Sequence, residues 1–317
     1  MLKLFANIFG QSDAAGSKLP AALVKAVIER AVDGTDPRLR IVSGYARVLK
    51  KPVLQAADYI IGMIDGLPEP VLASRSGLDS DPGLAALLYS AERTEQFISR
   101  DPAMVEFRGA NPLVLQPVTA LLVAQSTLKR GFGYGEVEGQ VLTDVARTTV
   151  GFDQHLLVAV AREEAETRRL LKRRAFDQLL ALALLHVTER KEERESLGTR
   201  KALLRSKLDI LQRGGSFTQH TGANDQLKLQ ASLEDIEQQL AKLDASGDVL
   251  AGNLALIADV LSNAGEHLWL EDRTLCLDRL YVVHDKPSRS APSIVFKEIH
   301  TSDGRQATLK LLSIPAQ

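Results

Sequence analysis

The sequence predicts a mainly α-helical protein that ends in a small β element, and three observations carry this prediction. None of the twelve prolines lies between residues 118 and 286, and because proline breaks helix interiors, this stretch permits long helices. Apolar residues within it repeat at the 4-3 spacing of a helical seam. The last part of the chain changes to short apolar runs separated by turn residues. We therefore expect an N-terminal domain of short helices, a long-helix antiparallel coiled-coil hairpin with a bundled base, and a small C-terminal antiparallel β element.

The same signals place the domain boundaries. We expect an N-terminal tail over 1–16, a helical domain over 17–134, a long-helix bundle and hairpin over 135–265 with its tip at about 213–225, and a β subdomain over 266–317.

Composition narrows the class of protein. The chain has 317 residues, of which 45% are hydrophobic and 25% charged, as in an ordinary soluble globular protein. Lys and Arg total 39 against 40 Asp and Glu, so no strong overall field attracts nucleic acid or acidic lipid. The single cysteine, Cys276, excludes an internal disulfide framework and a cysteine-rich zinc site. We expect a cytoplasmic protein without a cofactor.

The N-terminal residues Met1–Gly10 have two interpretations. Their apolar stretch is too short for a signal peptide, and no segment of the chain holds the roughly 20 apolar residues that a membrane helix needs. The segment could form a short amphipathic element that contacts a membrane surface through Leu2, Leu4, Phe5, Ile8 and Phe9. The simpler interpretation is a turn or frayed end, and we expect no transmembrane segment.

Prolines mark helix starts in the N-terminal domain. Asp-Pro or Asn-Pro pairs end at positions 37, 82, 102 and 112, where the acidic or amide side chain caps the helix and proline takes its first position. Helices are expected over 20–33, 37–50, 52–65, 82–99, 102–108 and 112–129, with a loop over 67–81.

Residues 130–139 are predicted to form a hinge, because four glycines lie within this segment. A phosphate-binding loop is the alternative. The segment matches neither the dinucleotide nor the Walker glycine pattern, and no strand is expected before it, so a flexible connector is preferred.

The middle of the chain is predicted to hold the long helices. A first helix is expected near 136–150, and the stretch 152–213 has no proline, although the sequence leaves open whether it forms one helix. After a polar, glycine-containing turn, a regular a/d seam follows at Leu229, Leu233, Ile236, Leu240 and Leu243. A helix over 248–263 is expected to pack beside the apolar segment 176–187.

Strands are expected only near the C-terminus. The apolar runs 267–270, 275–283, 293–301 and 306–314 predict a sheet of three or four strands, and Asp303-Gly304 predicts the hairpin turn between the last two.

No catalytic or metal-binding pattern is recognisable in the sequence. The six histidines form no HExxH motif, and no GxSxG nucleophile motif occurs. Cys276 lies between two leucines, which indicates a packed thiol rather than a reactive one. We therefore assign no catalytic, cofactor or metal residue.

The candidate interaction residues are basic or lie at the hairpin tip. Arg40, Arg47 and Lys51 are predicted to share a helix face, and residues 168–174 form a second basic patch. Gly214, Gly215 and Phe217 lie in the predicted tip, where an exposed phenylalanine could contact a partner. A solvated surface and a plain connector are the simpler interpretations of these two features.

The function that we expect is non-catalytic. A cytoplasmic scaffold or adaptor would bind a protein partner, or a second copy of itself, through the hairpin or a sheet edge. The alternatives are a nucleic-acid-associated protein that uses the basic helix faces, and an enzyme whose site is assembled from dispersed residues.

Overall fold

The protein has an α/β fold with a seven-stranded mixed sheet, so the prediction of a mainly α, all-α chain with a small β element is wrong. The computed structural model describes residues 21–111, 116–137, 140–213, 222–243 and 248–316. These fall into two compact units: unit 1 contains residues 57–176 and 264–316, and unit 2 contains residues 21–56 and 177–263. No helix in the described ranges is long and apolar enough to cross a membrane.

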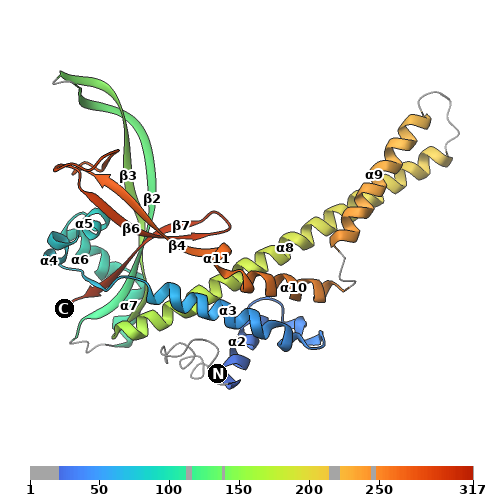
Figure 1. Cartoon of the computed structure of the whole chain (residues 1–317), viewed down its shortest axis with the longest axis horizontal. Helices are drawn as coiled ribbons and strands as arrows, with labels where there is room; N and C mark the ends of the chain where they lie inside the picture. Colours follow the sequence, from blue (N-terminus) through green and yellow to red (C-terminus); the bar gives the residue numbers. More distant parts are fainter. Residues whose placement is uncertain (1–20, 112–115, 138–139, 214–221, 244–247, 317) are drawn as a thin grey trace. The chain divides into compact units, whose positions relative to one another are not determined.

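The largest correction concerns two long strands. Strand β2 (Val118–Val137) replaces residues 118–129 of the predicted helix 112–129 and residues 130–137 of the predicted hinge. Strand β3 (Gln140–Ala161) replaces residues 140–150 of the predicted helix 136–150. The two strands pair antiparallel along their length (Figure 1). Ala120, Leu121 and Leu122 are all buried, so β2 is covered on both faces at its start. A strand buried on both faces lacks the alternation of polar and apolar residues that distinguishes it from a helix.

The strands of unit 1 close into a ring. Besides β2 and β3, the sheet contains β1 (Val71–Leu72), β4 (Leu268–Leu277), β5 (Val282–His284), β6 (Ser293–Thr301) and β7 (Gln306–Ile314). Their order is β1-β7-β2-β3-β5-β4-β6, and β6 also pairs with β7. The predicted strands 293–301 and 306–314 are β6 and β7, but β4 runs unbroken through 271–274 and the predicted strand 275–283 is interrupted at 278–281. All of them belong to a larger sheet instead of forming a separate one.

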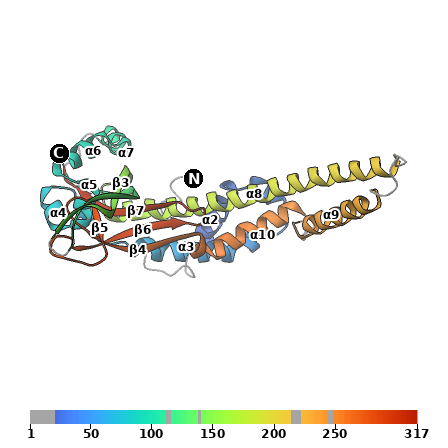
Figure 2. The same ribbon diagram turned by 90° about the horizontal axis from the view of Figure 1, so that it is seen from above.

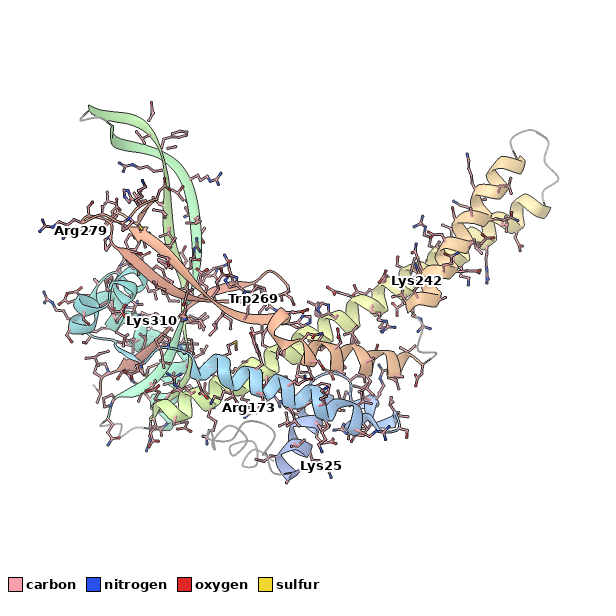
Figure 3. The ribbon with its side chains drawn as sticks, in the orientation of Figure 1. Lys25, Arg173, Lys242, Trp269, Arg279 and Lys310 are labelled. Atoms are coloured by element: carbon pink, nitrogen blue, oxygen red, sulfur yellow. The ribbon has the colours of Figure 1, made fainter. Side chains whose placement is uncertain are left out.

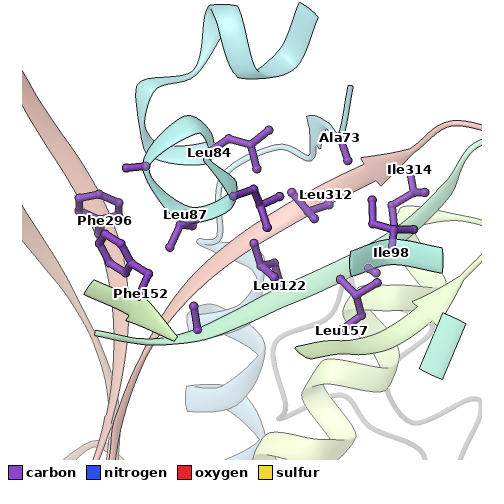
Figure 4. Close-up of a cluster of buried hydrophobic side chains, with 14 of the residues drawn as sticks. Ala73, Leu84, Leu87, Ile98, Leu122, Phe152, Leu157, Phe296, Leu312 and Ile314 are labelled. Atoms are coloured by element: carbon purple, nitrogen blue, oxygen red, sulfur yellow. The ribbon is translucent and has the colours of Figure 1, made fainter. Parts of the chain in front are cut away.

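Short helices cover one face of this sheet: α4 (Arg75–Ser80), α5 (Pro82–Leu88), α6 (Ala91–Arg100) and α7 (Pro102–Ala110). Leu84 and Leu87 of α5 pack with Leu122 and Leu312 of the sheet in one buried cluster (Figure 4). In the same cluster the rings of Phe152 and Phe296 lie 5.1 Å apart. Side chains of Ser74, Asp81, Ser90 and Asp101 cap the four helices. The Asp-Pro pairs predict the caps at Asp81 and Asp101, whereas the caps at Ser74 and Ser90 are not predicted.

Close backbone packing explains Gly77 in α4. A Cβ atom built on Gly77 would collide with the backbone carbonyl of Leu72 in β1. Only glycine lets the helix approach the strand this closely.

Three further segments have a secondary structure that differs from the prediction. The predicted helix 82–99 is divided at Tyr89, where φ is +65°. The predicted helix 37–50 is a 3₁₀ helix, η2 (Pro37–Ile41), followed by α3 (Tyr45–Asp65), which continues through Pro52. The predicted loop 67–81 contains β1 and α4.

Unit 2 is helical. It contains α2 (Ala21–Asp33), η2, the first part of α3, most of α8 (Glu164–Arg213), α9 (Gly222–Leu243) and α10 (Val249–Ser262). Helices α8 and α9 lie side by side in both views (Figures 1 and 2), and Glu237 of α9 pairs with Lys201 at 3.0 Å and Arg205 at 2.8 Å on α8. The stretch 152–213 is thus part strand and part helix, since α8 begins at Glu164. Helix α11 (Ala264–His267) leads back into β4 of unit 1.

Candidate functional site

A cleft of about 600 Å³ opens in unit 1 where α6 and the start of α7 face β3. We name it the Tyr89 cleft. It is lined by Leu87, Leu88, Tyr89, Arg93, Gln96, Phe97, Arg100, Asp101, Pro102, Phe152, Asp153, Gln154 and His155. This size is in the usual range for a small-molecule site.

Helix α6 presents one face to the cleft. Arg93, Gln96, Phe97 and Arg100 are spaced at i, i+3, i+4 and i+7, which places them along one side of a helix. Both arginines are exposed, and no carboxylate in the described ranges forms an ion pair with either guanidinium. The face therefore combines two available cations with an amide and an aromatic ring.

A β-bulge shapes the opposite wall. Between the pairs Val123–Leu156 and Gln125–Asp153, β2 contributes one residue and β3 contributes two, Gln154 and His155. Gln154 has φ of +52°, a conformation that side-chain-bearing residues rarely adopt. Bulges of this kind redirect side chains beside binding sites.

His155 is held in one orientation by this wall. Its Nε2 lies 2.8 Å from the carbonyl oxygen of Leu87, and because a carbonyl can only accept, Nε2 donates. The ring also packs edge-on against Phe97, at 5.9 Å between centroids. Burial lowers the pKa of His155, although the Leu87 hydrogen bond and the charge of Asp153 oppose that shift.

The lowered pKa of His155 predicts how the stability of the protein depends on pH. Because the folded state disfavours the protonated ring, the contribution of His155 to stability is present above its unfolded pKa of about 6.5 and is lost as the pH falls through the lower folded value. We expect the urea midpoint to fall between pH 7.5 and 5.5 by more in the parent than in His155→Gln. Equal shifts in the two proteins would contradict this assignment.

Tyr89 sits at the junction of two hollows. Its backbone has φ of +65° and ψ of −50°. The Arg93 guanidinium lies 5.4 Å from its ring centroid, and the Tyr281 ring lies 4.8 Å from it. Burial, with a smaller effect from Tyr89, raises the pKa of Tyr281 to about 12. Tyr89 and Tyr281 also line a wider hollow of about 1100 Å³ that includes Arg279 and Arg289.

Asp101 secures the floor of the Tyr89 cleft. It is 4% exposed, and its Oδ1 accepts from the backbone N–H groups of Ala103 and Met104 at the start of α7. Its Oδ2 accepts from the backbone N–H of Leu157 in β3, at 2.9 Å. One carboxylate therefore joins the helix start to the strand.

A second feature is the far part of the β2–β3 hairpin, which we name the outer ribbon: residues 125–137 of β2 and 140–147 of β3. β2 pairs with β7 only up to Ala124, and β3 pairs with β5 only at residues 148 and 149. In the described part of the chain, the outer ribbon has no strand beyond its own two (Figure 1). Phe132 is 80% exposed and Leu128 49%.

A buried polar cluster lies across four strands. The Glu298 carboxylate is 5% exposed and accepts from Arg273 at 3.0 Å, Ser126 at 3.3 Å and Thr308 at 3.4 Å. His300 Nε2 is buried without a hydrogen bond, 3.7 Å from both Glu298 and Glu271. Its ring stacks on Trp269 of β4, at 5.5 Å between centroids. Figure 3 labels Trp269 beside this part of the sheet.

The sequence-predicted residues do not assemble into one site in the described part of the chain. Arg40 lies in η2, where hydrogen bonds to Asp33 and Glu29 raise the pKa of its guanidinium. Arg47 and Lys51 are exposed on α3, and Gly44 (φ +77°) separates that helix from η2. Gly214, Gly215 and Phe217 lie outside the described residues.

Two cations of the second basic patch are turned into the structure of unit 1, while Arg174 is exposed. Arg168 donates to the carbonyls of Ile64 and Leu67 at 2.7 and 3.0 Å. Lys172 is 3% exposed and pairs with Asp65 at 2.7 Å. These cations are used within the fold.

Sequence reasoning missed the Tyr89 cleft and the outer ribbon. The spacing from Arg93 to Arg100 indicates one helix face, but the opposing wall depends on β3, for which the sequence predicts helix. Among the described residues, no group of three or more His, Cys, Asp or Glu side chains is placed to hold a metal ion. Comparison with family models, curated proteins and solved structures finds no match for this chain.

Proposed function

We propose that this is a non-catalytic binding protein whose outer ribbon takes up an extended segment of another protein as an additional strand. The observation that supports this proposal is the length of ribbon with two unpaired edges. A strand edge presents a row of backbone donors and acceptors, and addition of a partner strand satisfies them. A two-stranded hairpin alone is marginally stable in water, so a third strand also stabilises the ribbon.

The side chains of the outer ribbon indicate the partner's chemistry. Where they are described, three are basic, Lys129, Arg130 and Arg147, and one is acidic, Asp144. Glu136 and Glu138 follow further along the sequence. A second copy would bring the basic residues together again, and like charges on neighbouring strands repel. An acidic segment with apolar residues to meet Leu128 and Phe132 complements this surface.

A photo-crosslinking experiment in the native host tests the proposal. Phe132 is replaced by p-benzoylphenylalanine, and the crosslinked peptide is identified by mass spectrometry. We expect one dominant adduct with an acidic, extended segment of another protein. The same photo-reactive residue at Ile41, which is 78% exposed on η2, serves as the matched control and should not form that adduct.

Reversing the charges of Lys129 and Arg130 then distinguishes specific binding at the outer ribbon from nonspecific crosslinking. In the Phe132 photo-variant, adding Lys129→Glu and Arg130→Glu is expected to lower the adduct yield by at least about ten-fold, equivalent to about 1.4 kcal/mol. Lys51→Glu on exposed α3 should leave the yield unchanged. An adduct with a second copy, an adduct shared with Ile41, or insensitivity to Lys129 and Arg130 would contradict the proposal.

A shortened variant supplies a separate prediction about stability. Arg130 and Thr148 are directly opposite in the register, so residues 131–147 can be replaced by the turn Asn-Gly. We expect this variant to keep the parent's free energy of unfolding within about 0.5 kcal/mol and to lose the partner, because the removed residues contribute no core in the described structure. A folded protein that still captures the same segment would contradict the assignment of the binding edge.

A further inference from the structure

The Tyr89 cleft has the composition of an anion site. The guanidinium groups of Arg93 and Arg100 both reach it from α6, and Gln96 and Gln154 add amide donors. Its two carboxylates are Asp101, which is occupied by three backbone N–H groups, and the exposed Asp153. Available donors therefore exceed available acceptors.

Arg93 is oriented for binding. Its guanidinium carbon lies over the Tyr89 ring, 5.4 Å from the centroid, and this cation–π contact occupies none of the N–H groups with a hydrogen-bond acceptor. Arg100 lies seven residues later on the same helix, about 10 Å along the axis. The two long side chains can together bind one anion, or they can each bind one anionic group of an extended ligand.

Two strained backbone conformations also lie at the Tyr89 cleft. Tyr89 and Gln154 are two of the four described non-glycine residues with positive φ, and both line the cleft. Each such conformation costs on the order of 1–3 kcal/mol and persists only where the surroundings enforce it, typically at binding sites. This observation is independent of the charge argument.

We propose that the Tyr89 cleft binds a phosphorylated small molecule of nucleotide size, with its phosphate held by Arg93 and Arg100 and its planar body against Phe97. Arginine matches the geometry of phosphate oxygens with paired N–H groups. The volume of about 600 Å³ accommodates such a ligand, whereas a bare phosphate would leave most of it filled with water. His155, fixed by its Leu87 hydrogen bond, packs edge-on against Phe97 and lines the same cleft.

Calorimetric titration of the full chain tests this site. The probes are the four common nucleoside 5′-monophosphates, the corresponding nucleosides, and pyrophosphate. We expect at least one nucleotide to bind with Kd below about 1 mM, and its nucleoside and pyrophosphate to bind at least about ten-fold more weakly. Binding of the nucleoside as tightly as the nucleotide would overturn the assignment of a phosphate site, and no binding by any nucleotide would overturn the proposal.

Matched variants locate the binding. Arg93→Gln and Arg100→Gln are each expected to weaken nucleotide binding by about ten- to hundred-fold, since each removes a charge-assisted pair. Lys25→Gln removes one exposed charge of α2 that does not line the cleft, and its affinity should equal the parent's. Unchanged far-ultraviolet dichroism confirms that the variants are folded. Parent-like affinity in both arginine variants would overturn the proposal.

Discussion

Replacing Asp101 with alanine is expected to destabilise unit 1 by about 2–5 kcal/mol. The change removes the N-cap of α7, which is worth about 1–2 kcal/mol. It also leaves the Leu157 N–H without its acceptor, and a buried unsatisfied donor costs about 1–3 kcal/mol more. Urea unfolding followed by the fluorescence of Trp269, the single tryptophan, reports on this unit.

Two variants separate the cap from the bridge to β3. Asp101→Asn keeps one oxygen to cap α7, but its amide nitrogen takes the place of the Oδ2 that accepts from the Leu157 N–H. We therefore expect Asp101→Asn to lose less stability than Asp101→Ala, and more than a variant that loses only a helix cap. Asp248 caps α10 by accepting from the Leu250 N–H and is exposed. Asp248→Ala should cost only about 1 kcal/mol. Equal losses for Asp101→Ala and Asp248→Ala would show that the bridge contributes nothing.

Replacing Arg273 with methionine is expected to destabilise unit 1 by about 3–5 kcal/mol, because it leaves the buried Glu298 carboxylate without the Arg273 guanidinium. Ser126 and Thr308 would still donate to Glu298, but neutral hydroxyls do not replace a charge. Trp269 fluorescence during urea unfolding again supplies the measurement, since its ring stacks on His300 beside this cluster.

The double variant Arg273→Met/Glu298→Gln is the matched control. It removes the uncompensated Glu298 charge while keeping both side chains at about their original size, so most of the lost stability should return. A double variant no more stable than Arg273→Met would show that the loss came from packing of the Arg273 side chain. A single variant within about 1 kcal/mol of the parent would show that Glu298 needs no cation.

The sequence predicted local helix signals well and the long strands poorly. Asp81 and Asp101 act as caps as predicted, because capping depends on a few neighbouring residues, which the sequence displays directly. The segment 118–128 is apolar with few breaks and has no helix-breaking residue, so its periodicity fits a helix as well as a buried strand. What decides between them is pairing with β7 and β3, and that information lies elsewhere in the chain.

The candidate sites were hidden for the same reason. Arg93, Gln96 and Arg100 could be placed on one helix face, but their opposite wall depends on a bulge in β3 that puts Gln154 at positive φ. Conversely, the basic residues Arg40 and Lys172 looked available in the sequence. They are neutralised by carboxylates that the fold places beside them, namely Asp33, Glu29 and Asp65. A basic residue's availability depends on these partners, and residue type alone does not show it.

The closed ring of strands imposes an order on folding during synthesis. Val118 pairs with Ile314, 196 residues later, and β7 is also the neighbour of β1 and β6. At a synthesis rate of about 5–20 residues per second, β2 waits roughly 10–40 seconds for this neighbour. The β2–β3 hairpin can form locally meanwhile, as can the helices of unit 2 that are made before β4. The sheet of unit 1 cannot close until β7 has been made, so a chain stopped before residue 306 carries an open β2 edge at the base of the hairpin.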